Sequence, residues 1–261
     1  MNLSLKNKTA LVCGSTQGIG KAAAIELALL GCHVILVARN EEKLKATLNE
    51  LDQSQQQQHG YVCADFSKPE ELKTKVEKLV SERPIHILIN NTGGPAGGRA
   101  IDADVSEYLN TFTQHLICNQ ILAQAVVEGM KKEGYGRIIN IISTSVKQPL
   151  SNLGVSNTIR GAVANWSKTL ASELGQYNIT VNNVLPGATN TIRLQSIAEA
   201  KAAKTGQSVE EIFAEMAAEV PMKRIAQPEE VANAIAFLAS PAASYINGIN
   251  VPVDGGRTKS L

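Results

Sequence analysis

The chain has 261 residues, of which 44% are hydrophobic, enough for one large α/β domain or two small ones. Its net charge of +1 argues against binding of nucleic acid or of an anionic membrane. No apolar run approaches the ~20 residues of a spanning helix, and the opening MNLSLKNK lacks the apolar core of a signal peptide. We therefore expect a cytoplasmic protein. The four scattered cysteines predict buried free thiols and no metal site.

Short apolar runs alternate with longer amphipathic segments along the chain. The apolar runs predict strands over residues 9–14, 33–38, 60–65, 85–91, 136–143, 179–186 and 248–256. The intervening segments predict helices over residues 18–30, 41–52, 68–82, 104–131, 150–175 and 227–239. Apolar strands that alternate with helices indicate a parallel sheet covered on both faces. We expect a single α/β domain over residues 1–261.

The alternation is interrupted between residues 188 and 226. The stretch TIRLQSIAEAKAAKTGQSVEEIFAEMAAEV predicts two amphipathic helices on either side of Thr205-Gly206. An insertion after the carboxyl end of a strand lies where such sheets bind ligands. We interpret residues 188–226 as a helical substrate lid, with a contact between subunits as the alternative.

A glycine-rich turn follows the first predicted strand. The stretch CGSTQGIGKAAAIELA carries Gly14, Gly18 and Gly20 and leads directly into a predicted helix. Glycines permit a tight turn and close backbone approach, and the helix N-terminus attracts phosphate. The turn therefore predicts a dinucleotide-binding site, with a merely structural turn as the alternative.

The glycine spacing resembles that of the short-chain dehydrogenase/reductase family, with Cys13 where that family usually has threonine. The segment INNTGG (89–94) is similar to the family's Asn-Asn-Ala-Gly segment, and PGATNT (186–191) to its Pro-Gly-x-x-x-Thr segment. Residues 224–256 resemble its C-terminal signature, particularly that of 3-oxoacyl-acyl-carrier-protein reductases.

This resemblance covers essentially the whole chain. It implies one Rossmann-type, doubly wound parallel sheet of about seven strands, and hydride transfer between a nicotinamide and a small carbonyl or hydroxy compound. The implied cofactor-binding residues come from the glycine turn, the third strand and the two matching segments: Gly14, Ser15, Thr16, Gln17, Gly18, Ile19, Gly20, Asp65, Asn91, Gly93, Pro186, Gly187, Thr189 and Thr191.

The end of the second strand bears on the choice of cofactor. An NAD enzyme usually has an acidic residue there for the ribose 2′-hydroxyl. This chain has Ala38 followed by Arg39, whose guanidinium suits a 2′-phosphate. NADP(H) is therefore favoured over NAD(H), with a solvated surface charge as the alternative for Arg39. A second basic residue often present in the glycine turn is replaced by Gln17.

The catalytic positions that the resemblance implies are largely altered. The family uses a serine to orient the carbonyl oxygen, a tyrosine to supply the proton, a lysine four residues later, and an asparagine on the preceding long helix. Ser143 matches the serine, but Ser156 stands at the tyrosine position, Arg160 at the lysine position and His115 at the asparagine position. The segment LSNLGVSNTIR also resembles a divergent reductase-like subgroup that lacks the standard set.

These replacements are chemically unfavourable for proton transfer. A serine hydroxyl is a far weaker acid than tyrosine, and arginine does not release a proton. Arg160 is still able to hold ribose hydroxyls or a carboxylate-bearing ligand. His115 is a candidate proton donor, with helix packing as the alternative. Tyr108, or another tyrosine brought close by folding, is a further alternative.

Two functions follow from this pattern. The first is an NADP(H)-dependent oxidoreductase with an unusual proton source. In it Ser143, assisted by Ser156, orients the substrate oxygen, and Arg160 supplies positive charge for the cofactor ribose or a developing alkoxide. The second is a catalytically impaired NADP(H)-binding sensor or assembly subunit, and loss of nucleotide binding is a third outcome. The resemblance also implies a homotetramer, or a homodimer, formed through residues 104–131, 150–175 and 249–256.

Overall fold

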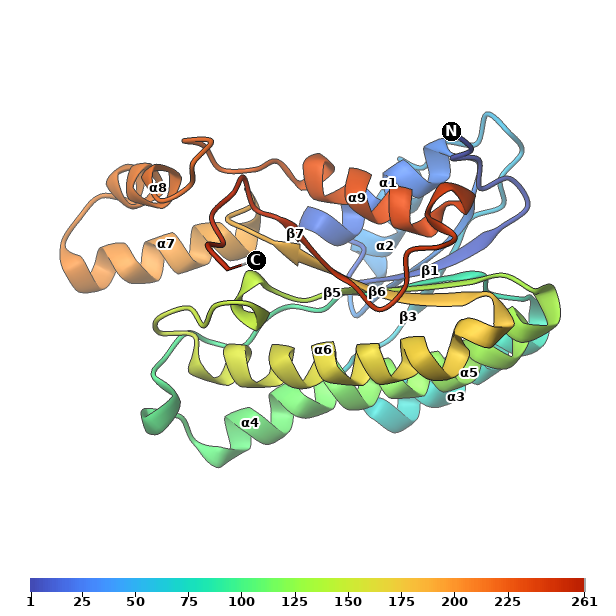
Figure 1. Ribbon diagram of the computed structural model, residues 1–261, viewed down its shortest axis with the longest axis horizontal. Coiled ribbons are helices and arrows are strands. Elements are labelled where there is room, and N and C mark those ends of the chain that lie inside the picture. The colour runs from blue at the N-terminus through green and yellow to red at the C-terminus, as the bar shows by residue number, and fades with distance from the viewer. Residues whose placement is uncertain (261) are drawn as a thin grey trace.

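The computed structural model describes residues 1–260, which form a seven-stranded parallel sheet in the order β3-β2-β1-β4-β5-β6-β7 (Figure 1). The order reverses direction beside β1, as in a doubly wound Rossmann-type sheet, so the predicted fold class is confirmed. The strands are β1 (Thr9–Cys13), β2 (His33–Ala38), β3 (Gly60–Cys63), β4 (Ile87–Asn90), β5 (Gly136–Ile141), β6 (Ile179–Pro186) and β7 (Asn250–Val253).

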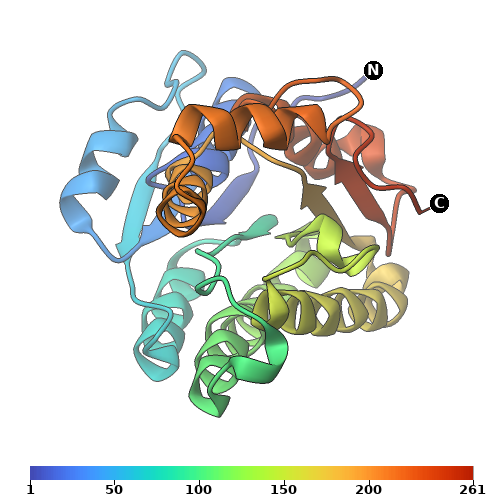
Figure 2. The same cartoon turned by 90° about the vertical axis from the view of Figure 1, so that its left-hand side faces the viewer.

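Helices cover both faces of the sheet (Figure 2). They are α1 (Gly18–Leu29), α2 (Glu41–Leu48), α3 (Pro69–Glu82), α4 (Val105–Phe112), α5 (Cys118–Glu133), α6 (Gly154–Leu174), α7 (Ile192–Thr205), α8 (Val209–Ala218) and α9 (Pro228–Ala239). Successive side chains of a strand point to opposite faces. On β1, Ala10 and Val12 pack with α1 and α9, whereas Leu11 and Cys13 pack with α3 and α5.

The long helix predicted over residues 104–131 differs in one respect. Asp104 and Glu107 form a capping box that begins α4, and Gly134 ends α5 in a left-handed conformation. Between them, Thr113–Ile117 form a π-helical turn. Such wide turns are rare and often mark functional sites. This one carries His115.

A row of asparagines, three buried and Asn250 half-buried, joins four neighbouring strands. The amide of Asn90 donates to Asn140 at 2.8 Å, Asn140 donates to Asn183 at 3.0 Å, and Asn183 donates to Asn250 at 2.8 Å. Buried amides are costly unless they find partners. Their pairing therefore holds β4 to β7 in register beneath the loops that follow these strands.

The inserted segment forms the two predicted helices, α7 and α8, which lie beyond the sheet at the left of Figure 1. Gly206 ends α7 with a positive φ, and Lys201 pairs with Glu215 across the two helices at 2.6 Å. The four cysteines are free, and Cys63 is only half-buried. None of the helices within residues 1–260 combines the length and apolar character that crossing a membrane requires.

Candidate active site

A cavity of about 650 Å³ lies at the carboxyl ends of the strands. Its size falls in the range of small-molecule sites. It brings together most of the residues singled out from the sequence: Gly14, Thr16, Gln17, Gly18, Ile19, Arg39, Asp65, Asn91, Gly93, Ser143, Ser156, Arg160, Pro186, Gly187, Thr189 and Thr191. Ser15, Gly20 and His115 are not among its lining residues.

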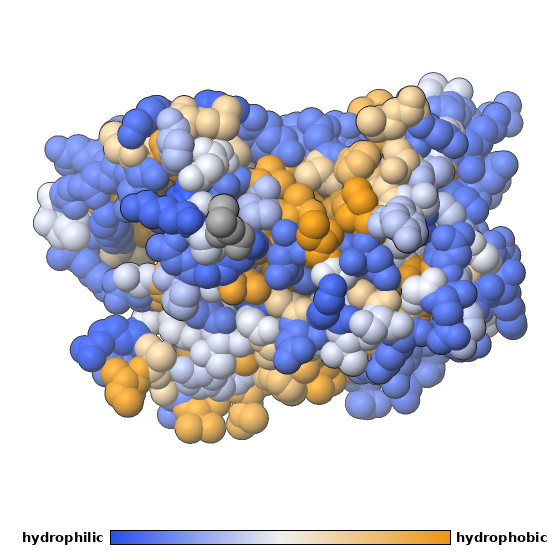
Figure 3. Space-filling model, viewed as in Figure 1, coloured by the Kyte–Doolittle hydropathy of each residue, from blue (hydrophilic) through white to orange (hydrophobic). Residues whose placement is uncertain are grey.

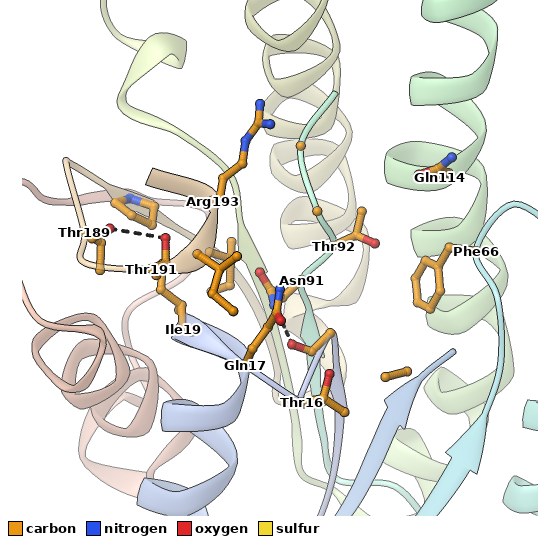
Figure 4. Close-up of a pocket in the computed structure, with 18 of the residues that line it drawn as sticks. Thr16, Gln17, Ile19, Phe66, Asn91, Thr92, Gln114, Thr189, Thr191 and Arg193 are labelled. Carbon is orange, nitrogen blue, oxygen red and sulfur yellow. Dashed lines mark hydrogen bonds between the residues drawn. The ribbon is translucent and has the colours of Figure 1, made fainter. Parts of the chain in front are cut away.

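The glycine turn is held tightly against β4. Gly14 has a φ of +59°, and a Cβ there would lie 2.7 Å from the Asn91 amide nitrogen. That amide donates to the carbonyl oxygens of Cys13 and Gly14, both at 3.3 Å. Figure 4 shows Asn91 reaching the turn. The site therefore needs glycine at residue 14 because both the backbone angle and the available space exclude a side chain.

Helix α1 begins at this turn without a cap. The Gln17 side chain makes no capping hydrogen bond, and the first turn carries no acidic residue. Its backbone N–H groups thus face the cavity unneutralised, which suits a phosphate.

Ser15 and Gly20 act beneath the turn and do not line the cavity. The Ser15 hydroxyl accepts from the Val37 backbone N–H at 3.0 Å and so ties the turn to β2. A Cβ at Gly20 would collide with the Gly14 carbonyl oxygen. Both residues are buried beneath the backbone of the turn, where they stabilise its conformation.

The far end of the cavity is basic. Arg39, Asn40 and Lys43 line it together with Asp65 and Phe66. Hydrogen bonds from Ser67 lower the pKa of the Asp65 carboxyl, with a smaller contribution from the charge of Arg39. Lys43 was missed in the sequence, although its place four residues after Arg39, in the first turn of α2, was a readable signal.

Ser143 occupies the start of a short 3₁₀ turn after β5. Its hydroxyl oxygen accepts a hydrogen bond from the Ser145 backbone N–H at 3.1 Å. This bond fixes the side chain and leaves the hydroxyl proton free to donate. A positioned donor of this kind suits a carbonyl or alkoxide oxygen.

Arg160 reaches from α6 to the end of β5. Its Nη1 donates to the Ile141 carbonyl oxygen at 2.8 Å, and the residue is only 8% exposed. Burial, followed by the charge of Arg193, lowers the pKa of the guanidinium to about 10. Arg160 therefore stays positively charged at neutral pH. No carboxylate within residues 1–260 forms an ion pair with it.

Ser156 lines the cavity one turn before Arg160, as their spacing predicted. It is half-buried. Over the part of the chain that the structure describes, its hydroxyl makes no hydrogen bond, so it is available to a ligand.

His115 is buried behind the cavity wall. Its Nε2 lies 3.1 Å from the Gly93 carbonyl oxygen and therefore carries the ring proton that it donates. Burial and then the charge of Arg160 lower the pKa of the ring well below its usual value. His115 is thus neutral at pH 7. This arrangement matches the packing alternative and supports the 91–94 loop.

No tyrosine within residues 1–260 lines the cavity. Tyr108 instead donates its hydroxyl to the Ala100 carbonyl oxygen at 3.3 Å on the surface. Folding therefore does not bring Tyr108 to the position left by the missing tyrosine.

The further lining residues that the sequence did not single out include Thr92, Gln114 and Arg193. Arg193 is the second residue of α7, and its guanidinium donates to the Pro95 carbonyl oxygen. Figure 4 shows its side chain between the beginning of α7 and the loop after β4. Thr191 begins α7 by accepting from the Leu194 N–H, and donates to Thr189. The sequence placed Arg193 in a lid but gave no sign of which way it points.

Comparisons with known proteins agree with this geometry. A family model described as enoyl-(acyl carrier protein) reductase matches residues 14–258. NADPH-dependent reductase BacG of Bacillus subtilis (strain 168) is 30% identical over 259 residues, covering 98% of this chain and 100% of that protein. The 7alpha-hydroxysteroid dehydrogenase of Escherichia coli (strain K12) is 30% identical over 261 residues, covering 100% and 98%.

Solved structures give the same result. The L-sorbose reductase of Gluconobacter frateurii, determined in complex with NADPH and L-sorbose, has a TM-score of 0.93 and 32% identity, and the match covers all of both chains. The similarity therefore spans the glycine turn, the strands of the sheet and helices α7 and α8 together. The chain belongs to the short-chain dehydrogenase/reductase family.

Proposed function

We propose that the protein is an NADP(H)-dependent oxidoreductase that reduces a carbonyl group, or oxidises a hydroxy group, on a small molecule, as 3-oxoacyl reductases do. One observation carries this proposal. The glycine turn and the trio Ser143, Ser156 and Arg160 line one continuous cavity, so a dinucleotide on the turn and a substrate beside Ser143 share a space.

The residues present fit NADPH. The uncapped N-terminus of α1 suits the pyrophosphate, and Arg39 with Lys43 suits the 2′-phosphate. The relatives named above as NADPH-dependent or NADPH-bound support the same cofactor. When bound, NADPH supplies the hydride.

The chain's own residues stabilise the charge that reduction creates. As the carbonyl oxygen becomes negative, the Ser143 hydroxyl donates to it and the Arg160 charge lies nearby. Ser156 supplies a second hydroxyl. Because no tyrosine in the described chain lines the cavity, we propose that the proton comes from solvent through these hydroxyls. The positive charge of Arg160 stabilises the alkoxide until it is protonated.

Consumption of NADPH with a panel of carbonyl compounds tests the proposal. Ser143→Ala should lower kcat by ~10²–10³-fold, the usual effect of removing one donor to an oxyanion. Ser106→Ala, on the exposed start of α4, is the matched control and should leave the rate unchanged. Equal rates in the Ser143 variant and the wild type would remove Ser143 from the mechanism.

The second candidate is a cofactor-binding protein without turnover. It is favoured by the replaced proton donor at Ser156 and the fixed charge at Arg160. The double variant Ser156→Tyr with Arg160→Lys discriminates between the two. Activity that appears only in the double variant supports a dormant site, whereas turnover by the wild type supports the oxidoreductase.

We also propose that the protein acts in the cytoplasm as a homotetramer or homodimer. Four free thiols suit a reducing compartment. Ile101, just before α4, and Val105 and Leu109 on α4 are exposed, and Figure 3 shows apolar atoms at that end of the molecule. Light scattering tests the assembly, and Leu109→Lys should shift it towards monomer if α4 forms the interface.

A further inference from the structure

Two arginines meet in the cavity without an acidic partner. Arg160 lies at the floor, 8% exposed, and Arg193 lies at the rim on the lid. Among the described lining residues Asp65 is the only acid, and it lies at the opposite end beside Arg39. Neither arginine forms an ion pair with a carboxylate within residues 1–260.

This arrangement is costly for the protein alone. A buried charge without a partner of opposite sign is destabilising by several kcal/mol. The Arg160 guanidinium has one backbone acceptor, the Ile141 carbonyl at 2.8 Å, and a neutral carbonyl does not cancel its charge. The positive charge of Arg193 adds to the cost, since it contributes to lowering the pKa of Arg160. Two like charges are therefore kept together at the site.

The cofactor does not account for both charges. Its phosphates would be held by the α1 N-terminus and the Arg39 end of the cavity, and a ribose held by Arg160 would offer only neutral hydroxyls. Arg193 comes from the lid, where a substrate enters. Its guanidinium uses one donor on the Pro95 carbonyl, which fixes its position and leaves further donors available.

We infer that the substrate carries a terminal oxyanion, a carboxylate or a phosphate, held between Arg160 and Arg193 while its carbonyl lies at Ser143. Guanidinium groups bind both oxyanions with paired hydrogen bonds. The inference rests on the proposed function and names the substrate class for that same site. Arg193 acts as a specificity residue that recognises the negative charge of the substrate.

A binding experiment tests this without any turnover. The complex with NADP⁺ cannot reduce a ketone, so calorimetric titration reports substrate affinity alone. The probes are pyruvate, acetoacetate and levulinate against their methyl esters, and dihydroxyacetone phosphate against dihydroxyacetone. We expect at least one oxyanion to bind ~10- to 100-fold more tightly than its neutral counterpart, the effect of a hydrogen bond to a charged group. Comparing the carboxylate pairs with the phosphate pair shows which of the two oxyanions the site prefers.

Substitutions show which residues produce the preference for the oxyanion. Arg193→Gln should remove most of the preference for the oxyanion. Lys204→Gln removes a positive charge from the exposed side of the same helix and should keep the full preference. Arg160→Lys retains a positive charge at the floor of the cavity and should keep part of the preference for the oxyanion. Equal affinity for every charged and neutral pair, or equal losses in the Arg193 and Lys204 variants, overturns the inference.

NADPH consumption with the same probes separates this inference from the proposed function. If oxyanions bind preferentially but none of the probes is reduced, the oxyanion site stands and the evidence turns against the oxidoreductase. If neutral and charged ketones are reduced with equal kcat/KM, the oxidoreductase stands and the oxyanion site is wrong.

Discussion

Arg160 on α6 donates a hydrogen bond to the carbonyl oxygen of Ile141, the last residue of β5, at 2.8 Å. The bond fixes a buried positive charge two residues from Ser143. With its pKa lowered to about 10, the guanidinium keeps its positive charge at neutral pH. The fixed charge should affect both the stability of the protein and its activity, and both effects can be measured.

Arg160→Met should separate stability from activity. Methionine has a similar length and removes the buried charge, so the free energy of unfolding in urea should stay equal or rise by up to ~4 kcal/mol. NADPH-dependent turnover should fall by ~10²-fold or more because the charge on the substrate oxygen is no longer stabilised.

Arg137→Met is the matched control for that variant. Arg137 is also buried, but it donates to Gly136 at 2.8 Å and lies 4.2 Å from the centre of the Tyr135 ring, away from the cavity. Because Arg137 is likewise a buried charge without an acidic partner within residues 1–260, stability should stay equal or rise, and turnover per folded molecule should stay unchanged. Equal losses of turnover in the two variants would make Arg160 a packing residue.

Arg39→Ala should weaken NADPH binding by ~10- to 100-fold and leave NADH binding nearly unchanged, because only NADPH carries the 2′-phosphate. Dissociation constants measured by fluorescence titration check this. Lys6→Ala, an exposed residue outside the cavity, provides the control. Tighter binding of NADH than NADPH to the wild type would contradict the assignment.

Gly20→Ala should disrupt the phosphate turn. The added methyl group would collide with the Gly14 carbonyl oxygen and lie 2.6 Å from the Asn91 amide nitrogen. We expect a loss of ~1–3 kcal/mol in stability and weaker NADPH binding. Gly129→Ala is the control, since nothing lies within 4 Å of its Cβ on α5. It should stabilise the protein by ~0.5–1 kcal/mol. Similar effects of the two substitutions would refute the crowding argument.

His115→Asn should change how stability depends on pH. The folded-state pKa of His115 lies below that of the unfolded chain, near 6.5. The unfolded state therefore takes up the proton first, and stability falls as pH drops through ~6.5. The asparagine variant should lose less stability between neutral and mildly acidic pH. Urea unfolding across that range measures the difference, and identical slopes would show that His115 does not contribute.

The sequence specified the fold closely because its signals are local. The β6 strand and the two lid helices follow from apolar runs, the Thr191 cap and the glycine at residue 206. The phosphate turn follows from its glycines between strand and helix. The replaced positions Ser156 and Arg160 could be identified because one helical turn separates them. Arg193 could not be assigned a role, since it reaches the cavity only through the path that α7 takes past the loop after β4, whereas the spacing of Lys43 from Arg39 was a readable local signal.

The sequence by itself determined the alternation of strands and helices, the glycine turn between β1 and α1, and the residue types at the four positions that the family resemblance points to, because these depend on neighbours in the chain. Tertiary structure alone decided that His115 lies behind the wall and donates to Gly93, and that Ser15 supports the turn from below. It also decided that Arg193 faces the same cavity as Arg160. Burial and charge proximity arise only when distant segments pack together, and they set what each side chain is able to do.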